Sequence, residues 1–90
     1  MIILDEKITS INIEKHGNLD FSDANIIVRK DNGFKSWEVD VVGADEFMTK
    51  MFIEGRDTYE LRMIDEGGKE YSGKAILGDN GFIGTGKLEY

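Results

Sequence analysis

The sequence predicts a single all-β domain over residues 1–90, built as a small antiparallel β-barrel of six to seven strands, with a flattened β-sandwich as the alternative. Two observations support this prediction. The chain has eleven glycines and no proline, and the turn dipeptides Asn32-Gly33, Gly67-Gly68 and Asn80-Gly81 separate short alternating segments. Helical periodicity is confined to residues 44–51, so we expect at most one short helix.

The first predicted hairpin turns at Asn32-Gly33. A two-residue turn there makes one face apolar over three successive pairs, because it places Val28 opposite Trp37, Ile26 opposite Val39 and Ala24 opposite Val41. The other face is polar except for Ile27, which lies opposite Glu38.

The next segment can be interpreted in two ways. One face of a short helix would collect Ala44, Phe47, Met48 and Met51. The apolar run continues through Phe52 and Ile53, so we favour a strand from Phe47 to Glu54. The loop Gly55-Arg56-Asp57 would then close a hairpin with the strand that follows.

The second assigned hairpin requires a three-residue loop, Glu66-Gly67-Gly68, because a two-residue turn would mix charged with apolar side chains on one face. The resulting pairs are Met63 with Tyr71, Leu61 with Gly73, Tyr59 with Ala75 and, on the solvent side, Glu60 with Lys74. Gly68 supplies the left-handed residue of the loop.

The last predicted hairpin turns at Asn80-Gly81. Its pairs are Leu77 with Gly84, Ala75 with Gly86, Gly73 with Leu88 and Tyr71 with Tyr90. Glycine inside a strand usually weakens it, so this pattern indicates a bend, a bulge or a neighbouring side chain that lies across the backbone.

Residues 81–87 also match part of a phosphate-binding loop, with glycine, four residues and then Gly-Lys. That loop needs Ser or Thr after the lysine and a helix behind it, but Leu88 follows Lys87. Residues 68–74 show the same partial match and are followed by Ala75. We therefore interpret these glycines as turn and strand residues and predict no nucleotide site.

The composition argues against several classes of protein. The absence of cysteine excludes disulfides and cysteine-based metal sites. A net charge of −7 without any basic tract argues against nucleic acid as a partner. No apolar run approaches the roughly 18–20 residues that a membrane span needs, and residues 1–6 do not form a signal peptide. We expect a cytoplasmic protein without a membrane partner.

Candidates for catalysis and metal binding are few. His16 is the only histidine, and we expect it to be solvated in a polar loop. Three pairs of carboxylates lie close together in the sequence: Asp20 with Asp23, Asp45 with Glu46, and Asp65 with Glu66. A chain with 18 acids among 90 residues is expected to contain such pairs by chance, so they do not indicate catalysis. Fragments of a calcium loop at residues 31–33 and 79–81 are better explained as turns. We predict no catalytic residue, no metal site and no cofactor.

Three apolar residues are candidates for a contact surface. Ile27 and Phe34 fall on the exposed face of the first hairpin, and Phe52 belongs to the apolar run of residues 48–53. If these groups met, they would form a patch of the kind that marks protein contacts. Unprotected edge strands offer a second route to association.

Residues 69–77, Lys-Glu-Tyr-Ser-Gly-Lys-Ala-Ile-Leu, and residues 84–88, Gly-Thr-Gly-Lys-Leu, resemble the closing hairpin of small β-rich proteins of phages and integrated prophages of Gram-positive bacteria. The resemblance covers about a third of the chain. It implies a structural or accessory binding role and carries over no functional residue.

We therefore expect a non-enzymatic protein-interaction or assembly module, with self-association as one form of that role. The alternative is a small OB-like barrel that binds single-stranded nucleic acid, which requires exposed aromatic and basic side chains. A small hydrolytic or metal-dependent enzyme is the third hypothesis.

Overall fold

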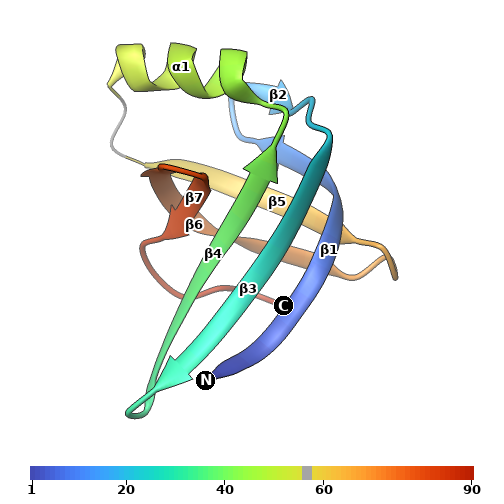
Figure 1. Ribbon diagram of the computed structural model, residues 1–90, viewed down its shortest axis with the longest axis vertical. Coiled ribbons are helices and arrows are strands. Elements are labelled where there is room, and N and C mark those ends of the chain that lie inside the picture. The colour runs from blue at the N-terminus through green and yellow to red at the C-terminus, as the bar shows by residue number, and fades with distance from the viewer. Residues whose placement is uncertain (56–57) are drawn as a thin grey trace.

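The computed structural model describes residues 1–55 and 58–90 and contains one closed antiparallel barrel (Figure 1). Its elements in chain order are β1 (Ile2–Ile13), β2 (Gly17–Asn18), β3 (Asp23–Asp31), β4 (Phe34–Val42), α1 (Asp45–Glu54), β5 (Tyr59–Asp65), β6 (Glu70–Gly78) and β7 (Gly81–Gly84). The sheet order is β2-β1-β3-β4-β7-β6-β5, and pairing of β1 with β5 closes a ring of six strands outside which β2 lies. The predicted small barrel is confirmed.

Strand β1 closes the ring because it has two partners in succession. Residues 2–7 pair with β3, whereas residues 8–13 pair with β5. The β1–β5 register shifts between Ile8 and Ser10, and the β1–β3 register shifts between Ile2 and Leu4. Such irregularities bend a strand and increase its twist, which lets β1 turn from one side of the barrel to the other.

The two hairpins with local turn signals have the predicted registers. In β3–β4, Val28 pairs with Trp37, and both turn residues have positive φ, 52° at Asn32 and 82° at Gly33. In β5–β6, Met63 pairs with Tyr71, and Gly68 has φ of 87°. The conformations required by these turns therefore fix the registers, as expected for short hairpins.

The register predicted for the last hairpin is wrong at the turn and correct farther on. The turn lies at Asp79-Asn80, so Leu77 pairs with Phe82 and Ala75 with Gly84. Gly81 is a strand residue that pairs with Asp40 and Gly78, and no larger residue fits there because a Cβ would lie 2.0 Å from the carbonyl oxygen of Val39. Beyond β7, the N–H of Thr85 donates to the carbonyl of Lys74, and Ser72 then pairs with Glu89, which is the predicted register. The two extra residues of this strand lie between Thr85 and Glu89.

Trp37 explains the glycines of this hairpin. A Cβ at Gly84 would lie 2.2 Å from its indole Cε2, and a Cβ at Gly73 would lie 2.7 Å from its Cζ2. The indole N–H also donates a hydrogen bond of 2.9 Å to the carbonyl of Gly86. The indole thus lies across the glycine backbone, one of the three explanations that the sequence offered.

Residues 45–54 form α1, so the favoured strand from Phe47 to Glu54 is wrong and the helical alternative is correct. Ala44 and Met51 are buried, while Phe47 and Met48 pack partly against the core. Gly55 ends the helix in the left-handed conformation, with φ of 70°. The hairpin expected before β5 is therefore absent from the described residues; Arg56 and Asp57 of its loop lie outside them.

The barrel interior is filled by apolar side chains from every strand of the ring, and Ala44 and Met51 extend the core to α1. Among residues 1–55 and 58–90, Asp65 is the one buried residue with a charged side chain. Its carboxylate accepts hydrogen bonds from the N–H groups of Gly67 and Lys69, both 2.9 Å, and from the hydroxyl of Tyr71, 2.8 Å. These bonds hold the β5–β6 loop, so Asp65 has a structural role.

Candidate functional site

The structure separates the three predicted contact residues. Phe34 begins β4 at the β3–β4 turn, whereas Phe52 lies on α1, which follows the other end of β4 (Figure 1). Both side chains are 79% exposed. Ile27 is half-buried on the outside of β3, between Asp5 and Glu38. Phe34 and Phe52 therefore belong to different surfaces and do not form the single patch considered from the sequence.

The surface with Phe34 lies on strand segments that extend beyond the closed ring. Strand β4 pairs with β3 along its whole length, but with β7 only at residues 38–40. On the other side of β3, residues 2–7 of β1 pair with β3 but precede the pairing with β5. Residues 1–6 and 29–37 thus form a three-stranded extension, here called the arm, with an open edge on each side.

Apolar side chains gather on the arm. Met1 is 80% exposed and Phe34 79%, and Ile2 and Ile3 are also exposed. The carbonyl of Met1 accepts a hydrogen bond from the N–H of Lys30, which places the start of β1 beside the β3–β4 turn. A hydrophobic edge strand is a template for pairing with another chain, so the arm is a candidate contact site.

Backbone hydrogen-bonding groups of the arm point to its open edges. In an antiparallel pair, the N–H and C=O of one residue point to one side and those of the next residue to the other. The C=O of Lys7 accepts from Glu66 on the side away from β3, so the backbone groups of Asp5 point that way. On β4, the N–H of Val41 donates to Asn80, so the groups of Lys35 point away from β3.

The two open edges carry opposite charges. Asp5 and Glu6 are exposed on the β1 edge. Lys30 and Lys35 are exposed and lie directly opposite each other near the β3–β4 turn. Like charges in directly opposed positions destabilise a hairpin, and a neighbouring acidic group would relieve this repulsion. The open β1 strand of the arm therefore carries two acids beside the Met1 ammonium group, which pairs with Asp31, and the basic side chains lie on β4 and on the adjacent residue of β3.

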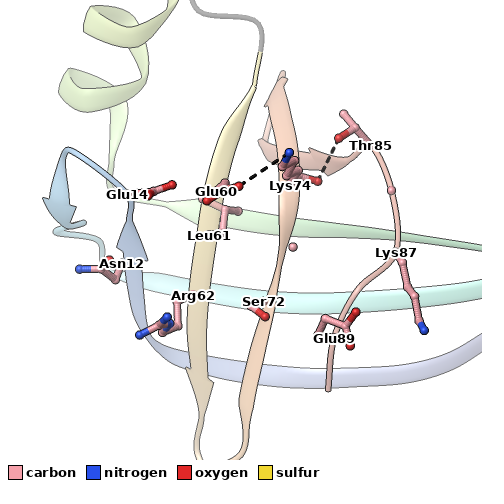
Figure 2. A pocket seen from close by; sticks show the side chains of 12 residues that line it. Asn12, Glu14, Glu60, Leu61, Arg62, Ser72, Lys74, Thr85, Lys87 and Glu89 are labelled. Atoms are coloured by element: carbon pink, nitrogen blue, oxygen red, sulfur yellow. Dashed lines mark hydrogen bonds and ion pairs between the residues drawn. The ribbon is translucent and has the colours of Figure 1, made fainter.

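A second candidate site is a groove of about 610 Å³ on the outer face of β1, β5 and β6, bounded by the C-terminal segment (Figure 2). Its charged lining residues are three acids and three bases: Glu14, Glu60, Glu89, Arg62, Lys74 and Lys87. The groove is thus electrically balanced, in contrast to the whole chain with its net charge of −7.

Within this groove, Glu14 and Glu60 form a hydrogen-bonded carboxyl pair. The hydrogen bond to Glu60 and the charge of that residue raise the pKa of Glu14. The Nζ of Lys74 lies 3.7 Å from Oε1 of Glu60, which favours the ionised form of Glu60. The hydrogen bond from Glu14 and this lysine lower the pKa of Glu60, so Glu60 loses its proton at a lower pH than Glu14 does.

Sequence reasoning found only half of this cluster. The Glu60–Lys74 pair follows from the β5–β6 register and is confirmed by the structure (Figure 2). Glu14 reaches Glu60 because β1 pairs with β5, and the N–H of Glu14 donates to the carbonyl of Glu60. No local turn signal connects these strands, so the sequence alone did not indicate the contact.

His16 differs from its expected state. It lies in the turn after β1, as predicted, but its ring packs against the rings of Phe47 and Tyr59, with centroids 6.1 and 5.9 Å away. Its Nε2 is buried and lacks a hydrogen-bond partner among residues 1–55 and 58–90. The expectation of a solvated ring is wrong because α1 covers this turn.

Residues 1–55 and 58–90 contain no group of three or more histidine, aspartate or glutamate side chains placed to hold a metal ion. In the same part of the chain, no helix has the length and apolar character needed to cross a membrane.

Comparisons with protein-family models, curated proteins and solved structures found no match.

Proposed function

We propose that the protein is a non-enzymatic assembly module that associates with further copies of itself through the arm. The observation that carries this proposal is the extension of β1, β3 and β4 beyond the closed ring. Residues 2–6 and 34–37 each have one strand partner, on β3, and present their other edge to solvent. Addition of a strand at such an edge supplies main-chain hydrogen bonds, and side chains on alternate positions supply specificity.

The exposed apolar residues support the same role. Met1, Ile2 and Phe34 lie beside the open edges, so a strand added there would remove their side chains from water. Burial of apolar surface contributes about 25 cal/mol per Å². Hydrogen bonding and apolar burial would therefore act at the same place.

The decisive measurement is the weight-average mass of the protein by light scattering or sedimentation from low to high micromolar concentration. We expect the mass to rise with concentration. Phe34→Lys should weaken association because it places a charge where apolar contact is needed. Phe52→Lys is the matched control, because Phe52 has the same exposure on α1, away from the arm.

A wild-type protein that stays monomeric over this range would refute self-association. If the Phe52 variant lost association and the Phe34 variant kept it, the contact would be assigned to α1 and not to the arm. Far-UV circular dichroism of both variants would establish that each keeps the wild-type content of strand.

A further inference from the structure

We propose that the copies pair head to tail, with the β1 edge of one arm against the β4 edge of the next. This inference rests on the proposed self-association and specifies its geometry. Each molecule carries both edges, and each edge has outward-pointing backbone groups, at Asp5 on β1 and at Lys35 on β4. Every copy can thus pair through its β1 edge on one side and through its β4 edge on the other.

Charge distinguishes this arrangement from a symmetric one. A two-fold pairing of β1 edges would bring Asp5 and Glu6 close to the same acids of the second copy. A two-fold pairing of β4 edges would bring Lys35 close to its equivalent. Pairing of β1 with β4 instead brings Glu6 toward Lys35, because both side chains lie on the face of the sheet that carries Ile26 and Trp37. Opposite charges on neighbouring strands stabilise a sheet, and like charges destabilise it.

The overall charge strengthens the argument. Molecules with a net charge of −7 repel each other on approach, so the exposed lysines of the arm provide a local attraction that partly offsets this repulsion. In each copy the arm lies at one end of the molecule, and α1 lies at the opposite end, beyond the barrel (Figure 1). The arm is therefore accessible on both sides.

A head-to-tail contact is heterologous, and it leaves one edge of each kind unoccupied at the ends of the assembly. It produces a ring if the rotation between copies closes and an open filament if it does not. In either case the assembly contains more than two copies at high concentration. A symmetric contact at a single edge would stop at the dimer.

Proline substitutions can block one edge at a time. Asp5→Pro removes the outward N–H of the β1 edge, and Lys35→Pro removes that of the β4 edge. Proline is tolerated on edge strands where the lost N–H faces solvent, so the hairpin itself keeps its ladder. Each variant retains the other edge intact.

The test is to measure the mass of each proline variant alone and of their mixture. We expect each variant alone to be monomeric, and the mixture to form a heterodimer with one copy of each that grows no further. Dimers of Lys35→Pro alone would show a symmetric β1 contact, and dimers of Asp5→Pro alone a symmetric β4 contact. Either result would overturn the head-to-tail arrangement while leaving self-association intact.

A second pair of variants covers the case in which proline disturbs the fold. Glu6→Lys and Lys35→Glu each place like charges at the head-to-tail contact, on the face that both side chains share, so each alone should associate more weakly than wild type. Their mixture restores opposite charges at one contact and should associate more strongly than either variant. A mixture no stronger than the two variants would contradict the inference. A monomeric wild type would instead refute the proposed function itself.

Discussion

The two halves of β1 contain the same residue type in opposite environments. Ile8, Ile11 and Ile13 are 1%, 1% and 0% exposed, whereas Ile2 and Ile3 are 52% and 42% exposed. Residues 8–13 pair with β5, and Asn12 and Ile13 pair with β2 as well, whereas residues 2–7 pair with β3 alone. Burial along this strand is therefore determined by closure of the ring and not by residue type, and isoleucine at an open edge marks surface available for contact.

The largest expected effect comes from truncating isoleucine in the two halves. Ile11→Ala should lower the free energy of unfolding by about 2–5 kcal/mol, because it leaves a cavity in a packed core. Ile2→Ala should change it by less than about 0.5 kcal/mol in the monomer. Urea unfolding at a concentration below the onset of association would measure both. Equal losses would mean that the two halves of β1 are equally packed.

A smaller effect is expected at the glycines that face Trp37. Gly84→Ala should destabilise the protein by about 1–3 kcal/mol, because the new methyl group must displace the indole. At Gly86 a Cβ would meet nothing within 4 Å, so Gly86→Ala is the matched control. Urea unfolding followed by Trp37 fluorescence would compare them. A neutral Gly84→Ala variant would show that the indole does not pack there.

The smallest effect concerns the Glu14–Glu60 pair at the seam between β1 and β5. Because the folded protein raises the pKa of Glu14 above 4.5, the stabilising contribution of its proton is present below that value and is lost as pH rises through the folded pKa. Glu14→Gln keeps an uncharged donor at every pH. The variant should gain stability relative to wild type as pH rises from acid to neutral.

Thermal melting across this pH range is the appropriate measurement for that variant. Glu89→Gln is the control, because it removes a carboxylate from the same groove but lies on the C-terminal segment. A similar pH-dependent gain in the control would assign the effect to the net charge of the groove and not to the carboxyl pair.

The sequence predicted the parts of this fold that depend on local turn chemistry. Asn32-Gly33 and the loop ending at Gly68 each require positive φ, and the alternation of apolar residues then leaves a single acceptable register. The position of Trp37 on the interior face followed from the same reasoning. The lysine opposite Glu60 was obtained in this way as well.

The remaining features depend on contacts between distant segments. Strand β7 lies two residues out of its predicted register because Gly81 must fit against the backbone of β4. The apolar run through Phe52 favoured a strand, yet those positions became the exposed face of α1 once Met51 was buried. The open arm could not be predicted either, because it depends on where β5 and β7 begin and stop their pairing.

The position of the single tryptophan has a practical consequence. Trp37 is the last residue of the open stretch of β4, and its indole N–H is bonded to the carbonyl of Gly86. The protein thus contains a natural fluorophore at the boundary between the barrel core and the unpaired edge of β4. Without any attached label, the emission of this residue reports on events at either side of that boundary.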